Sequence, residues 1–131
     1  MNFSGVYEIQ GLKTALEKKV DSVVAEAENM AAKPVITQLD FQDIPGTNCY
    51  CDSLAEEEIG KRIISFGPEG LHFLHSGNYH YLTKLWLKLV KEPFELLVFD
   101  HHTDMQRPAF GGILSCGGWI REALETNENL K

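Results

Sequence analysis

The sequence lacks the features that mark membrane-spanning or secreted proteins. Its 131 residues contain no apolar run near the ~20 residues that a membrane-spanning helix needs. Residues 1–10 have no basic segment followed by an apolar stretch, which a secretory signal would require. The cysteines are few, at positions 49, 51 and 116, and their spacing fits no disulfide framework. We therefore expect reduced thiols in a cytoplasmic protein.

Clustered basic residues are also missing. The chain has 12 Lys and Arg residues against 19 Asp and Glu residues, which gives a formal net charge of −7. This balance argues against nucleic acid or an anionic membrane as the main partner, because both favour clustered positive charge. An acidic chain suits a metal ion or a cationic small-molecule substrate. With 44% hydrophobic residues, residues 1–131 can form the core of a single domain.

Apolar residues follow helix and strand periods in alternation. In residues 11–30 they recur at steps of three and four, as in an amphipathic helix. Residues 95–100 (ELLVFD) form a nearly continuous apolar run, typical of a strand covered on both faces. The complete pattern predicts strands at 35–41, 71–75 and 95–100 and helices at 11–30, 52–64, 79–91 and 117–125. Asp52 or Ser53 would cap the second helix.

This alternation predicts an α/β fold. Short connections between alternating strands and helices favour a mostly parallel sheet with helices on both faces and right-handed crossovers. In such folds the chemistry lies beyond the carboxyl ends of the strands. Three strands make a small sheet, so we expect an incomplete domain. An uncovered edge strand tends to pair with another copy, so we also expect a homo-oligomer.

The candidate ligands follow two of the predicted strands. Asp100, His102 and Asp104 come at the end of the strand over residues 95–100, and they would point to one side if the chain stayed extended. Two carboxylates and an imidazole are good ligands for Mn²⁺, Zn²⁺ or Fe²⁺. The alternative is a polar loop in which the aspartates cap turns. His80 follows the preceding strand, and its expected proximity favours the metal site.

Two motifs give these residues a family resemblance. Residues 99–104 (FDHHTD) resemble the D-x-H-x-D signature of the arginase/agmatinase ureohydrolases, and residues 77–81 (GNYHY) resemble the upstream glycine-rich motif with a metal-binding histidine. The resemblance implies a three-layer α/β/α fold with a mostly parallel sheet. It also implies two divalent ions, usually Mn²⁺, that activate water for attack on a guanidinium-type carbon.

Carried onto this sequence, the resemblance implies that His80 binds one ion and His102 the other. Asp100 and Asp104 would bind or bridge both ions. Two features depart from the family pattern. Tyr79 stands where the family has an aspartate, and no aspartate follows Asp104 to form the late S-x-D-x-D motif. The resemblance therefore covers the N-terminal half of such a domain. It identifies no catalytic residue beyond the ligands.

These departures leave three interpretations open. The chain is part of a ureohydrolase, or a related hydrolase that cleaves amides, or an inactive fragment or subunit that binds metal weakly and needs a partner. Among the remaining histidines, His101 and His75 are candidates to contact the metal ligands and orient them without binding the metal. We interpret His72 as a core or surface residue. We interpret Cys49 and Cys51 as buried or loop thiols, because no second cysteine pair accompanies them.

Overall fold

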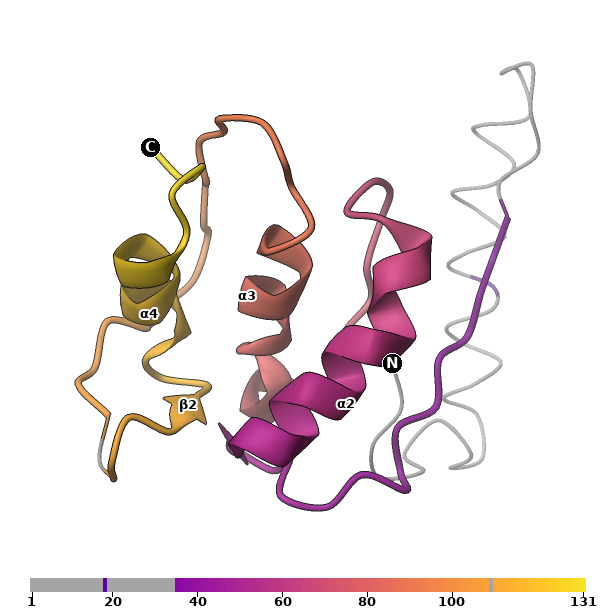
Figure 1. The fold of residues 1–131 in the computed structure, drawn as a ribbon, viewed down its shortest axis with the longest axis horizontal. Helices are drawn as coiled ribbons and strands as arrows, with labels where there is room; N and C mark the ends of the chain where they lie inside the picture. Colours follow the sequence, from indigo (N-terminus) through magenta and orange to yellow (C-terminus); the bar gives the residue numbers. More distant parts are fainter. Residues whose placement is uncertain (1–17, 19–34, 109) are drawn as a thin grey trace. The chain divides into compact units, whose positions relative to one another are not determined.

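The computed structural model describes residues 18, 35–108 and 110–131. The chain divides into two compact units, Met1–Asp43 and Ile44–Lys131. Apart from Lys18, the helix predicted over residues 11–30 lies outside the described residues. The elements with defined bounds all belong to the second unit. In chain order they are β1 (Tyr50–Cys51), α2 (Ser53–Ile63), η2 (Ile64–Phe66), η3 (Gly77–Tyr79), α3 (Leu82–Leu87), β2 (Leu114–Ser115) and α4 (Trp119–Thr126) (Figure 1).

Helix α2 begins where the sequence predicts it. The Asp52 side chain accepts a hydrogen bond from the backbone N–H of Ala55 at 2.9 Å, which satisfies one of the free donors of the first turn. Ala55, Ile59 and Ile63 are buried, and their spacing of four places them on one face of the helix. The chain then tightens into η2 and leaves the helix at Gly67, whose φ of 69° suits glycine. The predicted helix over residues 52–64, with Asp52 as its cap, is confirmed.

The cap of α2 gives a first prediction. Replacing Asp52 by alanine should lower the free energy of unfolding by about 1 kcal/mol, because the N–H of Ala55 loses its acceptor. Urea denaturation followed by circular dichroism measures this change. Ser53→Ala is the control, since Ser53 is exposed and is not the capping residue. Equal stability of the two variants would show that the cap contributes nothing.

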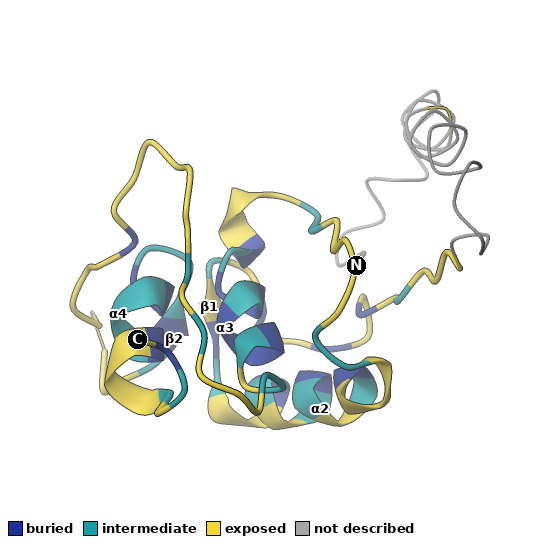
Figure 2. Ribbon diagram, turned by 90° about the horizontal axis from the view of Figure 1, so that it is seen from above, coloured by how far each residue is buried: buried dark blue, intermediate teal, exposed yellow. Residues whose placement is uncertain are grey.

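The core of the second unit is helical. Helix α3 lies between α2 and α4 (Figure 1). Figure 2 shows the buried residues gathered on these helices, while much of the connecting chain is exposed. Lys84 on α3 is only 4% exposed, and its Nζ lies 2.5 Å from Glu122 Oε1 on α4 and 3.4 Å from Glu56 Oε1 on α2. One buried cation therefore links the three helices.

The predicted three-layer α/β/α fold with a mostly parallel sheet is wrong. Within the described residues the only sheet has two antiparallel strands, β1 and β2, with Tyr50 opposite Ser115 and Cys51 opposite Leu114. Residues 71–75 and 95–100 form no strand, and within residues 35–41 only Asp40 takes part in a bridge. Phe94 and Leu130 form an isolated parallel bridge.

Residues 95–100 do not form the predicted strand because no described segment pairs with them. Residues 95–100 have the composition of a strand that is buried on both faces, but Leu97 is 78% exposed and Phe99 is 91% exposed. A strand needs a hydrogen-bonded neighbour as well as apolar side chains. The helix predicted over residues 79–91 is also shorter than expected, because α3 covers only Leu82–Leu87. The helix predicted at 117–125 is confirmed as α4. No helix in the described part of the chain has both the length and the apolar character that crossing a membrane requires.

Candidate metal centre

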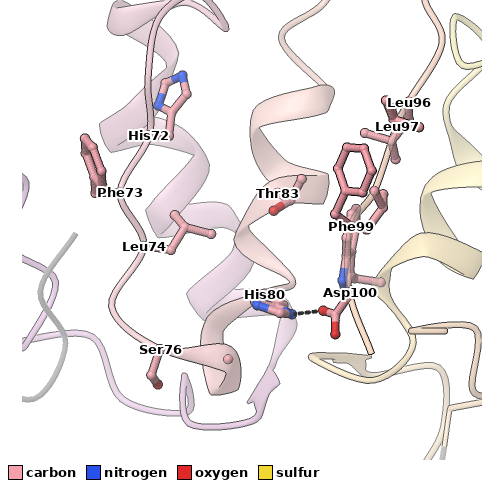
Figure 3. Close-up of a pocket in the computed structure, with 13 residues that line it drawn as sticks. His72, Phe73, Leu74, Ser76, His80, Thr83, Leu96, Leu97, Phe99 and Asp100 are labelled. Carbon is pink, nitrogen blue, oxygen red and sulfur yellow. Dashed lines mark ion pairs between the residues drawn. The ribbon is translucent and has the colours of Figure 1, made fainter. Parts of the chain in front are cut away.

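Three of the four predicted ligands converge at one point. His80 Nδ1 lies 3.2 Å from Asp100 Oδ2 and 3.3 Å from Asp104 Oδ2. One potential ligand atom from each of the three residues lies within 4.8 Å of the others. Figure 3 shows the side chains of His80 and Asp100 pointing toward each other. His80 thus forms one small cluster with two aspartates that lie 20 and 24 positions further along the chain.

The turn before α3 positions His80. The residue directly follows η3, and its N–H donates to the carbonyl of Gly77 at 3.1 Å. Its neighbours Tyr79 and Tyr81 are both buried, and the Tyr81 hydroxyl donates to the carbonyl of Thr47 at 2.5 Å. The two buried tyrosines therefore fix the backbone on either side of His80, and the half-exposed imidazole of His80 points toward the two aspartates.

Asp100 is held in its charged form. Its Oδ1 accepts the backbone N–H of His102 at 2.9 Å. This hydrogen bond is the largest cause that lowers the pKa of Asp100 below its usual value; burial opposes it, and the neighbouring charges of His80 and His102 add to it. Asp100 is therefore a carboxylate at neutral pH, as a metal ligand must be.

Asp104 is the most enclosed of the three ligands. It is 6% exposed, and its φ of 47° lies in the left-handed region that aspartate tolerates better than most residues. Its Oδ2 accepts a hydrogen bond from the indole N–H of Trp119 at 2.6 Å, and its carbonyl accepts the N–H of Ile120 at 3.1 Å. The first turn of α4 therefore fixes both the backbone and the carboxylate of Asp104.

The other predicted site residues are not part of this three-residue cluster. The His102 side chain is 84% exposed, although its Nδ1 lies 3.5 Å from Asp100 Oδ1. His101 is exposed. His75 packs edge-on against the ring of Tyr79, with centroids 5.4 Å apart. The alternation argument fails for His102 because residues 100–104 turn rather than continue as a strand.

Sequence reasoning did not identify the role of Trp119. The available signal was chemical: an indole N–H is a donor that needs a partner when it is buried, and Trp119 follows the aspartate loop closely. The other tryptophan, Trp86, belongs to α3. It is buried, with its ring 4.1 Å from that of His72.

The geometry of the cluster fits a divalent ion. When metal–ligand bonds are about 2.1 Å, neighbouring ligand atoms lie roughly 3.0–3.4 Å apart in octahedral or tetrahedral coordination. The two separations from His80 Nδ1, 3.2 and 3.3 Å, fall in this range, and all three ligand atoms lie within 4.8 Å of one another. An imidazole with two carboxylates suits Mn²⁺, Zn²⁺ or Fe²⁺. The same separations allow His80 Nδ1–H to donate to either carboxylate, so a proton and a metal ion compete for this position.

A groove opens beside the cluster. His80 and Asp100 lie along it, and its walls come from the segments before η3 and before Asp100, with Thr83 of α3 between them (Figure 3). Phe73 and Leu74 line one side, and residues 96–99 line the other. A small molecule in this groove would contact apolar walls and the Asp100 carboxylate.

The hydrogen bond from the Trp119 indole to Asp104 gives a second prediction. Trp119→Phe should weaken Mn²⁺ binding by about 10–100-fold, because groups that orient a metal ligand typically contribute this much to affinity. Calorimetric titration measures the change. Trp86→Phe is the matched control, because among the described residues the indole nitrogen of Trp86 has no hydrogen-bond partner. Equal affinity in both variants would show that Trp119 does not position Asp104.

Comparisons with known proteins identify one relative. No family model and no solved structure matches the chain. A Thermotoga maritima protein described as an uncharacterized protein is 35% identical over an alignment of 115 residues, covering 75% of this chain and 47% of the relative. The chain thus spans about half the length of this curated relative.

Proposed function

We propose that His80, Asp100 and Asp104 form a divalent-metal centre, with Mn²⁺ as the preferred ion, in a hydrolase of the ureohydrolase (arginase-like) type. The observation that carries this proposal is the convergence of three ligand atoms within 4.8 Å. These residues belong to the two motifs that resemble the family. The proposal needs no parallel sheet, because the turn before α3 and the first turn of α4 position the ligands.

Each residue has a defined part in this proposal. Asp104 supplies a buried carboxylate that Trp119 fixes, and His80 supplies an imidazole from a rigid turn. Asp100 has two oxygens with different neighbours: Oδ2 lies near His80, and Oδ1 lies near His102. In this proposal Asp100 would help to hold both ions, and His102 would help to hold the second. Bound divalent ions would supply the Lewis-acid chemistry that activates water for attack on a guanidinium or amide carbon.

The substrate in this proposal is a small molecule that carries a guanidinium or amide group. The carboxylates attract a cationic guanidinium, and the net charge of −7 adds to this attraction. The groove beside His80 would hold the apolar part of such a molecule. We place the protein in the cytoplasm, where its free thiols stay reduced.

The functional assembly in this proposal includes a second copy of the chain. Leu71, Leu97 and Phe99 are strongly exposed, and large exposed apolar patches mark interaction sites. A second copy packed against residues 95–100 would also form part of the groove that these residues line. Light scattering at micromolar concentrations should report a dimer or a larger assembly, and a monomer would contradict this part of the proposal.

The alternative function is an inactive fragment or subunit that binds metal weakly. It is favoured by the absence of aspartates after Asp104, since only three predicted ligands converge. An assay for urea release from arginine and agmatine with Mn²⁺ separates the two. A hydrolase gives release that depends on Mn²⁺ and on His80, and the alternative gives none.

The metal centre itself is tested by calorimetric titration with Mn²⁺. The wild-type chain should bind, and His80→Ala should bind at least about tenfold more weakly. His101→Ala is the matched control, because it removes an exposed imidazole next to Asp100. Equal affinity of wild type and His80→Ala would contradict the proposed centre.

A further inference from the structure

Two cysteines face each other where the antiparallel pair ends. The register of β1 and β2 places Tyr50 opposite Ser115, so the next pair outward is Cys49 and Cys116. The N–H of Cys116 donates to the carbonyl of Cys49 at 2.9 Å, which continues the pairing to these residues. Both cysteines lie one residue outside the paired strands, and this hydrogen bond keeps their backbones adjacent there. For comparison, facing residues of a regular antiparallel pair have Cα atoms about 4.5–5.5 Å apart, within the range of about 4.4–6.8 Å that a disulfide requires.

The side chains of the two cysteines also interact. Burial raises the pKa of the Cys116 thiol, and the charge and hydrogen bond of the neighbouring Cys49 thiol add to this shift. Both residues are partly exposed, so a small oxidant can reach them. Cys51 differs in position and exposure: it is buried and faces Leu114, and burial raises its pKa to about 12.

The backbone at Cys49 is unusual. Its φ of 63° lies in the left-handed region, which residues other than glycine rarely adopt. Such conformations persist where the surrounding structure holds them, and they cluster at functional positions. Here the bond from Cys116 fixes Cys49 in place.

We propose that Cys49 and Cys116 form a reversible intrachain disulfide, a redox site separate from the metal ligands. With hydrogen peroxide as the oxidant, one thiol loses its proton, the thiolate attacks a peroxide oxygen and the O–O bond breaks. The departing hydroxide takes up that proton, so a sulfenic acid and water form. The second thiol attacks this sulfur, the S–O bond breaks, and a second water leaves. Two electrons pass from the two sulfurs to the peroxide.

This disulfide would act next to the proposed metal centre without using its ligands. Cys116 lies in the turn between β2 and α4, and the next residue, Gly117, accepts the N–H of Gln106 at 2.9 Å. Gln106 follows Asp104 by two positions. A covalent link at Cys116 would therefore fasten this turn, and the loop bonded to it, to the segment before β1.

The test oxidises the full-length chain with hydrogen peroxide, blocks free thiols, and maps the peptides without reduction by mass spectrometry. We expect a peptide pair linked through Cys49 and Cys116, restored to free thiols by dithiothreitol, and a higher unfolding temperature in the oxidised form. Cys51→Ser is the matched control; it should form the same link at an unchanged rate, and it removes ambiguity because Cys49 and Cys51 share a tryptic peptide. Cys116→Ser should form no intrachain link.

Two results would overturn the proposal. One is that both thiols remain free at peroxide concentrations that oxidise exposed methionines. The other is that the intrachain link uses Cys51, or that only links between chains appear. Circular dichroism of each serine variant before oxidation shows whether the variant is folded. A folded variant without the disulfide has lost the cysteine pair, not the fold.

Discussion

Replacing Lys84 by methionine is expected to lower the free energy of unfolding by about 3 kcal/mol. The Lys84 ammonium group is the buried cation that links α2, α3 and α4 through Glu56 and Glu122. Methionine fills a similar volume, so the loss comes from two carboxylates that remain partly buried without this partner. Urea denaturation at neutral pH measures the effect.

Lys88→Met is the matched control. Lys88 also pairs with Glu56, but its side chain is 48% exposed, so its loss should cost at most about 1 kcal/mol. Replacing Lys84, Glu56 and Glu122 together by methionine and glutamines should recover much of the stability, because no buried charge is left unpaired; Lys88 loses Glu56 but is half-exposed. If Lys84→Met and Lys88→Met were equally stable, the buried cation would have no special role.

The same network sets a pH dependence. Burial raises the pKa of Glu56, but hydrogen bonds and charges from Lys88 and Lys84 outweigh it, and the net pKa lies below the usual 4.5. A lowered pKa in the folded state contributes stability above the usual value, and this stability is lost as the pH falls through the folded value. In Lys84→Met the loss of stability below pH 4.5 should be smaller, which denaturation at several acidic pH values measures.

Asp104→Asn is expected to weaken Mn²⁺ binding by at least about 100-fold. Residues that only orient a metal ligand typically contribute about 10–100-fold to affinity, and the loss of a proposed ligand should exceed this. Asparagine keeps the volume, an oxygen that can accept from Trp119, and tolerance of the left-handed φ of 47°. Only the negative charge is lost, so the fold should remain intact. Calorimetric titration gives the affinity, and circular dichroism checks the fold.

Glu125→Gln is the control for the change in net charge, because Glu125 pairs with Arg121 on α4 and lies outside the metal cluster. This variant should bind Mn²⁺ as the wild type does. An Asp104→Asn variant with wild-type affinity would remove Asp104 from the proposed ligand set.

Local signals in the sequence predicted local structure well. The start of α2 depends on one side chain, Asp52, and on the spacing of Ala55, Ile59 and Ile63, so nearby residues suffice to identify it. The strands depend on partners elsewhere in the chain. Residues 95–100 have strand composition, but no described segment pairs with them, and composition alone does not reveal this.

The candidate cluster could be predicted in part although the fold could not. His80, Asp100 and Asp104 come together because two short segments pack beside α3 and α4, and this needs no parallel sheet. The position of His102 was derived from strand alternation, and the turn at Asp104 breaks that alternation. The bond from Trp119 depends on how α4 packs, which the sequence does not encode in any short motif.

Pulsed electron paramagnetic resonance of the chain with one equivalent of Mn²⁺ tests the central claim most directly. With ¹⁵N-labelled histidine, the proposed centre predicts a nitrogen coupling to Mn²⁺ in the wild type and in His101→Ala, and the loss of this coupling in His80→Ala. A coupling that persists in His80→Ala, or is absent from the wild type at full occupancy, would contradict a metal centre built on His80.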